Sequence, residues 1–208
     1  MGVFLLGLDL GQSTDYTAAA VVERLAVPGG ASRPLYHIRH VERAKLGTPY
    51  PAIVARVQSL MKSEPLKGST RLVVDATGVG LPVVDLLQQA GLAPIPVSIH
   101  GGDEVSYGAT GVWRVPKRDL VATLQVLLQT GRLKIADGLA EGPALAQEML
   151  AFRVRIDARS GHDTFGNDWR ENPHDDLVLA VALAVWYGER GGSPMTTEEY
   201  RALLNLFR

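Results

Sequence analysis

The feature that most constrains the fold is an apolar run near the start of the chain, residues 3–10 (VFLLGLDL), whose one charged residue is Asp9. Its length suits a single strand, and nearly continuous apolar character is typical of a central strand covered on both faces. Alternation along the strand places Asp9 on the face of Leu5 and Gly7, where Gly7 leaves space beside the carboxylate. A buried ionised carboxylate is costly unless a metal ion, a cationic partner or a shifted pKa compensates it. We therefore expect a central strand whose acid is neutralised.

Further acids stand in two other settings. Asp75 ends the segment RLVVD, and Asp175 and Asp176 open the run HDDLVLAVALAVW. Asp75 can also simply begin a turn, because Asp and Gly favour turns. Twelve uncharged residues follow Asp176, so the sequence predicts a helix that is buried along much of its length and whose N-terminus is brought to the sheet.

The start of that helix offers a structural explanation for one of its acids. Asn172 suits the N-cap and Pro173 the first helical position. Asp175 would then lie three residues after the cap, where an acid satisfies backbone N–H groups and complements the helix dipole. Asp175 is therefore as readily structural as catalytic, whereas the cap does not account for Asp176.

The composition is that of an ordinary domain. With 208 residues and 46% hydrophobic content, the chain can build one sizeable core, and a single domain is expected. The absence of cysteine excludes disulfides, thiol nucleophiles and Cys-ligated zinc, and a cytoplasmic setting is the simplest expectation. No signal peptide or membrane span is indicated, and the net charge of −1 leaves nucleic-acid binding undecided.

The order of the remaining segments predicts a mixed α/β sheet with helices on both faces. A short polar turn at 11–15 implies an antiparallel meander of the first three strands. Residues 100–115 are expected to form an exposed excursion, and 153–170 a hairpin or long loop. Further strands are expected at 16–24, 34–44, 71–75, 94–99 and in RLKIA, and helices at 50–62, from Pro82 to about Gly91, from Pro116 to Gly131 and at 139–152.

The conjunction of these acids points to a metal site. Two strand-borne acids and a helix-borne acid can converge with no basic partner close in sequence, and oxygen-only ligation of this kind suits Mg²⁺ or Mn²⁺. Two such ions about 3.5–4 Å apart would activate a water and stabilise the leaving oxygen in phosphodiester hydrolysis. The pattern therefore predicts a nuclease.

Four segments resemble the nuclease domain of the large terminase subunit of tailed bacteriophages, which belongs to the ribonuclease-H-like superfamily. They are GLDLGQSTDYTAAAVV (7–22), LVVDATGVG (72–80), GVWRVPKRDLV (111–121) and HDDLVLAVALA (174–184), and the resemblance extends from about residue 3 to about 188. It implies a ribonuclease-H-like domain over 1–190, and a C-terminal helical tail, 191–208, is expected to pack on it. The capping box at Thr196 and Glu199 supports that tail.

The resemblance also implies roles and partners. Asp9 and Asp75 match the first two metal-binding acids, and Asp175 and Asp176 match the acidic pair that supplies the third, without separating the two. The implied reaction is two-metal-ion cleavage of double-stranded, concatemeric viral DNA during genome packaging. It would take place in the host cytoplasm, with an ATPase motor, the small terminase subunit and the capsid portal as partners. No GxxxxGK[ST] phosphate loop occurs, so we do not expect this chain to hydrolyse ATP.

Two other functional classes stay open. The segment DLGQSTDYTAAAVVE also resembles the phosphate-binding turn of actin-like sugar kinases and chaperone ATPases, although 208 residues hardly accommodate their two lobes. A catalytically silent module that docks on DNA or protein is the other alternative. His174 could be a ligand, a proton-transfer group or part of the helix start, and a supporting role is favoured. Basic residues available for sequence-independent contacts to the DNA backbone are Arg114, Lys117, Arg118, Arg132, Lys134, Arg153, Arg155, Arg159 and Arg170.

Overall fold

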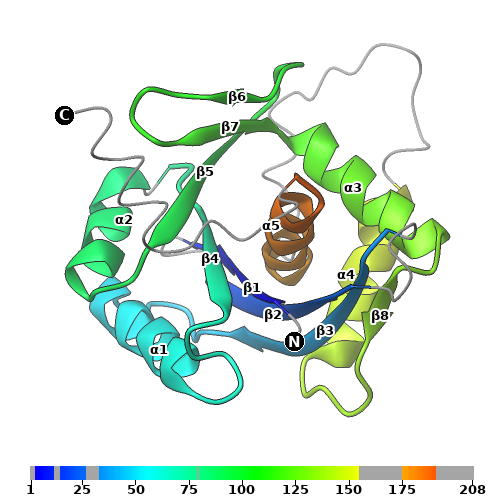
Figure 1. Ribbon diagram of the computed structural model, residues 1–208, viewed down its shortest axis with the longest axis horizontal. Coiled ribbons are helices and arrows are strands. Elements are labelled where there is room, and N and C mark those ends of the chain that lie inside the picture. Colours follow the sequence, from blue (N-terminus) through cyan, green and yellow to red (C-terminus); the bar gives the residue numbers. More distant parts are fainter. Residues whose placement is uncertain (1–2, 12–14, 27–32, 79, 155–174, 191–208) are drawn as a thin grey trace.

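A computed structural model describes residues 3–11, 15–26, 33–78, 80–154 and 175–190. These residues form one mixed sheet of eight strands, which is flanked by five helices (Figure 1). The strands are β1 (Val3–Asp9), β2 (Ala18–Leu25), β3 (Leu35–Arg43), β4 (Thr70–Asp75), β5 (Pro94–His100), β6 (Ser106–Tyr107), β7 (Trp113–Pro116) and β8 (Leu133–Ile135). The helices are α1 (Tyr50–Lys62), α2 (Gly80–Gln89), α3 (Lys117–Gln129), α4 (Gly142–Val154) and α5 (Asp176–Arg190).

The strand order β6-β7-β5-β4-β1-β2-β3-β8 confirms the predicted ribonuclease-H-like sheet. β1, β2 and β3 pair antiparallel as the expected meander, and β4, β5 and β7 continue the sheet in parallel from β1. β1 is therefore central, with β2 on one side and β4 on the other. Its even-numbered apolar side chains face one helical layer and its odd-numbered ones face the other.

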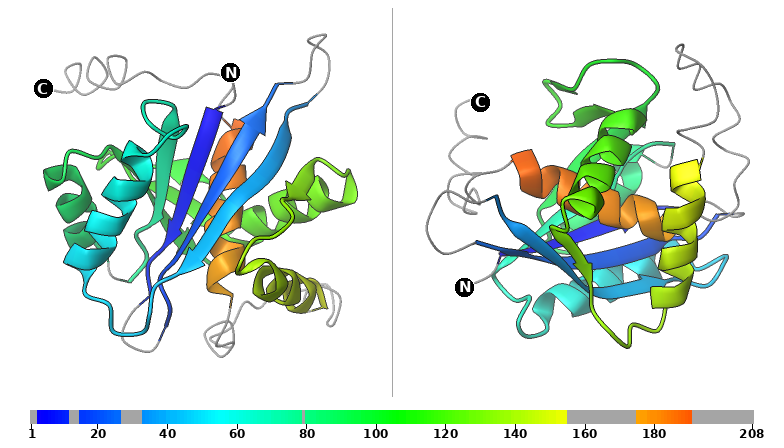
Figure 2. Two further views of the ribbon diagram at one scale, coloured as in Figure 1. Left: turned by 90° about the horizontal axis from the view of Figure 1, so that it is seen from below. Right: turned by 90° about the vertical axis from the view of Figure 1, so that its right-hand side faces the viewer.

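Helices cover both faces of the sheet, as predicted (Figure 2). α1 and α2 lie on the face of Phe4, Leu6 and Leu8, while α3, α4 and α5 lie on the opposite face. α5 packs across β1, β2 and β4, and all but three of its fifteen residues are buried. Because it is enclosed by the sheet, α3 and α4, the uncharged stretch after Asp176 needs no polar face.

Two expectations from the sequence need correction. The predicted excursion at 100–115 contains the edge strand β6 and most of β7, because the short strand β7 pairs with β5 across a glycine-containing loop that hides the strand signal. α5 begins at Asp176, three residues later than Pro173 would predict, with the Asp175 carbonyl accepting a hydrogen bond from the Leu179 N–H at 2.9 Å. Asn172 lies outside the described residues, as do the predicted hairpin from 155 onward and the tail.

Other boundaries agree with the sequence. α2 and α3 end just before Gly91 and Gly131, whose φ values of 78° and 66° are the left-handed conformation that terminates a helix most easily at glycine. In the described ranges we find no helix long and apolar enough to span a membrane.

Candidate active site

Asp9 and Asp75 lie next to each other at the ends of two parallel strands. Leu8 of β1 is paired with Val74 of β4, so the next residue on each strand is one of the two acids. Both carboxyl groups project to the face covered by α5, and Asp9 and Asp75 are only 7% and 8% exposed. Thus the sheet brings together two of the sequence-predicted acids without help from any loop.

Gly7 determines how closely α5 approaches this edge. A Cβ atom at Gly7 would lie 1.8 Å from the carbonyl oxygen of Ala180, so the backbones of β1 and α5 are in direct contact. The space that Gly7 leaves is therefore filled by the helix. Because Ala180 lies over Gly7, the first turn of α5 extends toward Asp9 and carries Asp175 and Asp176 to the same end of the sheet.

The electrostatic environment of Asp9 shows that the four acids form one cluster. Burial raises the pKa of Asp9 well above its ordinary value, and the charges of Asp75, Asp176 and Asp175 raise it further. Lys117 acts in the opposite direction. The environment of Asp9 thus disfavours its ionised form unless a cation is close.

Asp75 combines a structural and an electrostatic role. Its Oδ1 accepts a hydrogen bond from the Thr77 N–H at 2.7 Å, so it does begin the predicted turn. Burial raises its pKa, and hydrogen bonds with Thr77 and Asp9 and the charge of Lys117 oppose that change. Because each carboxyl group shifts the pKa of the other, Asp9 and Asp75 behave as an interacting acid pair in the metal-free protein.

Asp175 is engaged by Lys117, which begins α3. The Lys117 Nζ lies 3.0 Å from Asp175 Oδ2, and neither side chain is more than 18% exposed. Since Lys117 also acts on Asp9 and Asp75, its ammonium group provides positive charge to three acids of the cluster. Sequence analysis assigned Lys117 to the DNA backbone, and the structure places it among the carboxylates.

Asp176 has a different cationic neighbour, Arg43 at the end of β3. The Arg43 Nε lies 3.7 Å from Asp176 Oδ2, which is within ion-pair range but too long for a hydrogen bond. Burial raises the pKa of Asp176 to about 6; Arg43 opposes this, while Asp175 and Asp15 add to it. Its Oδ2 is buried and has no hydrogen-bond partner among the described residues.

Arg43 and Glu148 are the two residues of this region that sequence reasoning missed. Arg43 is paired with Ala18, which is itself paired with Asp9, so the small side chain of Ala18 separates acid and guanidinium in one row across three strands. Glu148 of α4 is 6% exposed and forms an ion pair with Arg43. The sequence pattern that could have identified Glu148 as a buried acid is its position on the buried face of α4, next to Met149 and three residues after Leu145.

The donors fit a divalent cation, but the side chains are not arranged as a finished coordination sphere. The cluster contains carboxylate oxygens without thiols, which is the chemistry of Mg²⁺ or Mn²⁺, and the buried Asp176 Oδ2 lacks a partner. Nevertheless, across the described ranges no three acidic or histidine side chains converge closely enough to hold one ion. Asp175 is occupied by Lys117, and the carboxyl groups of Asp9 and Asp75 interact with each other. A cation would have to replace these interactions.

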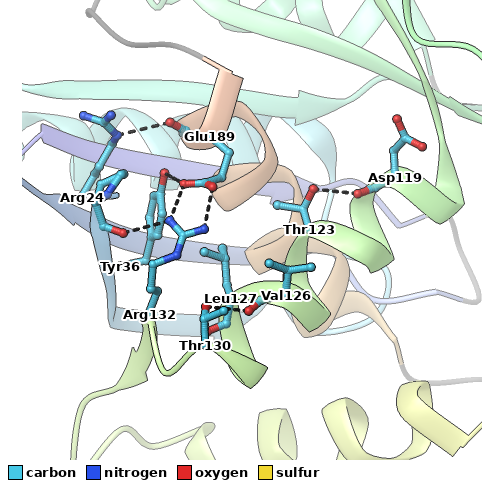
Figure 3. A network of polar contacts seen from close by, with 11 residues as sticks. Arg24, Tyr36, Asp119, Thr123, Val126, Leu127, Thr130, Arg132 and Glu189 are labelled. Carbon is cyan, nitrogen blue, oxygen red and sulfur yellow. Dashed lines mark hydrogen bonds and ion pairs between the residues drawn. The ribbon is translucent and has the colours of Figure 1, made fainter. Parts of the chain in front are cut away.

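The residues predicted to contact DNA differ in how exposed they are and in whether they are paired with acids. Arg114 on β7 is exposed, whereas Arg118 binds Asp103 through an Nη1–Oδ1 contact of 2.5 Å. Arg132 must be withdrawn as a candidate, because it is 9% exposed and its guanidinium pairs with Glu189 at 2.7 Å (Figure 3). The side chain of Arg153, and the residues Arg155, Arg159, Arg170 and His174, lie outside the part of the chain that the structure describes.

Comparison with known proteins places the fold. No protein-family model and no curated protein matches the sequence. Among solved structures, the large terminase nuclease from the thermophilic phage G20c aligns with a TM-score of 0.56 and 20% identity over 88% of this chain and 81% of that chain. The Mn-soaked human cytomegalovirus terminase nuclease domain aligns at 0.49 and 15% over 88% and 81%, and Thermus thermophilus RuvC at 0.41 over 91% and 98%. The first of these alignments shows that this chain has the fold of a terminase nuclease domain.

Proposed function

We propose that this protein is a divalent-metal-dependent endonuclease that hydrolyses DNA phosphodiester bonds. The observation that carries the proposal is that Asp9, Asp75, Asp175 and Asp176 lie at one end of the sheet, near enough for the other three acids to raise the pKa of Asp9. Asp9 is nearly inaccessible to water and is surrounded by three other acids, which is unfavourable unless positive charge is bound there. The shared fold with a terminase nuclease supports this reading.

In the proposed site, Asp9 and Asp75 bind the cations from the sheet, and the acids at the start of α5 bind from the helix. Two bound Mg²⁺ or Mn²⁺ ions would supply the Lewis acid that activates water and stabilises the leaving oxygen. Lys117, released from Asp175, would lie beside the reacting phosphate. Arg114 is exposed on the strand that leads into α3 and would contact the DNA backbone without reading sequence.

The biological role that we propose is cleavage of concatemeric viral DNA during genome packaging in the host cytoplasm. That role requires an ATPase motor, the small terminase subunit and the capsid portal as partners. We also propose that residues 1–190 form the nuclease domain and that residues 191–208 pack on it.

Cleavage of supercoiled and linear DNA in Mg²⁺, Mn²⁺ or EDTA tests the activity. We expect cutting in either metal and none in EDTA, with little sequence preference. Asp9→Asn and Asp75→Asn should abolish cutting, because Asn keeps the shape but removes the charge that binds the ions. Asp85→Asn, which changes an exposed acid on α2, should cut as the unmodified protein does.

Two results would overturn the proposal. Absence of cutting at high protein concentration in both metals would favour a docking module, provided that the addition of a motor subunit also fails to restore it. Unchanged cutting by Asp9→Asn and Asp75→Asn would show that these acids are not ligands. Nucleotide binding measured by calorimetry would favour the kinase-like alternative instead.

A further inference from the structure

Glu148 is a buried acid with two defined partners, and the proposed chemistry does not use it. Its Oε2 accepts a hydrogen bond from the Val178 N–H at 3.1 Å, and its Oε1 faces the guanidinium of Arg43. Val178 lies in the first turn of α5, where backbone N–H groups have no partner within the helix. Glu148 therefore fixes the start of the helix that carries Asp176, although it belongs to α4.

Arg43 is held between two acids but is not shared equally. It is in direct contact with Glu148, while its Nε stays 3.7 Å from Asp176 Oδ2. Its guanidinium also lies over the ring of Tyr16, 5.4 Å from the centroid, which restricts how it can move. Arg43 Nε and Nη2, Glu148 Oε1 and Asp176 Oδ2 all lack a hydrogen-bond partner among the described residues, so the guanidinium meets both acids as ion pairs, with the closer contact to Glu148.

The charge balance explains why this arrangement matters. While it is paired with Glu148, Arg43 lowers the pKa of Asp176 but approaches that carboxylate only to 3.7 Å. If Arg43 lost Glu148, its guanidinium would be the nearest unpaired cation to Asp176 and would form a charge-assisted hydrogen bond with it. A carboxylate held in that way is a poorer ligand for a divalent ion.

We propose that Glu148 is a positioning residue that binds Arg43 and so keeps Asp176 available to a divalent cation, an inference that rests on the proposed nuclease function. Glu148 does so from the neighbouring helix, by holding both the guanidinium and the first turn of α5. The proposal assigns Glu148 no contact with the cation or with DNA.

The test is Mn²⁺ binding to the full chain, measured by calorimetry and by the Mn²⁺-induced change in melting temperature. Glu148→Gln keeps an acceptor for the Val178 N–H but removes the charge that holds Arg43. We expect at least about a tenfold loss of Mn²⁺ affinity, the usual range for groups that orient metal ligands. Adding Arg43→Gln to Glu148→Gln should restore most of that affinity, because the competing guanidinium is gone.

The matched control lies at the other end of α5. There, Glu189 accepts hydrogen bonds from Arg132 and from the Tyr36 hydroxyl at 2.9 Å (Figure 3). Glu189→Gln breaks an ion pair at the far end of the same helix, where the Glu189 side chain is 24% exposed against 5% for Glu148, so it should lower the melting temperature but leave Mn²⁺ affinity unchanged. This variant separates a loss of helix stability from a change at the acids.

Each outcome decides the matter. Mn²⁺ affinity that is unchanged in Glu148→Gln would overturn the positioning role while leaving the nuclease proposal intact. An equal loss of Mn²⁺ affinity in Glu148→Gln and in the double variant with Arg43→Gln would also overturn it. That result would show that Glu148 supports only the fold. Absence of Mn²⁺ binding by the unmodified protein would refute the nuclease proposal and this inference together.

Discussion

Lys117 provides the positive charge that the acids of the cluster need in the absence of a metal ion. It contacts Asp175 directly and acts on Asp9 and Asp75 as well. Removing the Lys117 ammonium group would lower the stability of the fold, since the buried carboxylates would then repel each other without compensation. In the proposed site, the lysine and a divalent cation would therefore compete for the same acids.

Replacing Lys117 with Met should separate the two effects. In EDTA we expect the melting temperature to fall by roughly 4–10 °C, equivalent to about 2–3 kcal/mol for a protein of this size. With Mn²⁺ present, the difference from the unmodified protein should shrink, because the ion supplies the missing charge. Differential scanning fluorimetry with and without Mn²⁺ measures both, and Lys62→Met, at an exposed position of α1, is the control. An equal loss of melting temperature in EDTA and in Mn²⁺ would contradict competition.

The two acids at the start of α5 should respond oppositely to neutralisation. Asp176→Asn removes a buried charge whose pKa is raised to about 6, so we expect the metal-free protein to become more stable and cleavage to be lost. Asp175→Asn breaks the ion pair with Lys117, so we expect a loss of about 1–2 kcal/mol in EDTA. Urea unfolding and cleavage assays on both variants check this. Full activity of the double variant would disprove the participation of either acid.

At the scale of single residues, sequence reasoning identified the acids but not what surrounds them. Asp9 and Asp75 could be found because each interrupts or ends an apolar strand. Arg43 could not, since its position beside Asp176 depends on a bulge between Val21 and Val22 that shifts the pairing of β2 with β3. Such a shift in register depends on the assembled sheet and has no strong local signal.

At the scale of elements, the contact between β1 and α5 decides where the acids meet. Most strands and helices were predictable from apolar periodicity and from glycine and proline at their ends. The short strands β6 and β7 were not, because they have two and four residues and depend on the pairing of β7 with β5 and of β6 with β7 rather than on their own sequence. The true start of α5 was also missed, since Glu148 on α4 supplies the acceptor that a local cap was expected to provide.

Gly7→Ala should show how tightly this contact is constrained. The added Cβ would fall 1.8 Å from the Ala180 carbonyl oxygen, so helix or strand must move. We expect a loss of roughly 3 kcal/mol or more in urea unfolding, because backbone atoms cannot repack. Gly142→Ala, whose Cβ would meet only the Leu139 Cβ at 3.4 Å, should be nearly neutral. Equal stability of the two variants would contradict direct backbone contact.

At the scale of the whole molecule, the buried acids make stability depend on pH. The folded-state pKa of Asp176 is raised from 3.8 to about 6, so its contribution is fully present below pH 3.8 and is lost as pH rises through 6. Asp9 acts in the same direction. Glu42 acts in the opposite direction, but its lowered pKa of about 2 places its effect at more acidic pH.

We therefore expect the metal-free protein to lose about 2 kcal/mol of unfolding free energy between pH 4.5 and 7 through Asp176. Urea unfolding in EDTA across that range measures the loss. Asp176→Asn should show a flatter profile, and Mn²⁺ should restore stability at the upper end. Parallel profiles for the two proteins would rule out Asp176 as the source.

The absence of a side chain at Gly7, where β1 meets α5, has a consequence for how this protein tolerates change. Elsewhere in the core, the loss of a methyl group can be compensated when a neighbouring residue is replaced by a larger one. Many combinations of core residues can therefore fill the same interior. Where Gly7 meets Ala180, no side chain can change to alter the spacing between sheet and helix. That spacing is set by contact between backbone atoms. Extensive redesign of the surrounding interior should therefore leave the relative position of Asp9 and Asp176 unaltered, which makes this junction a natural fixed reference for engineering the molecule.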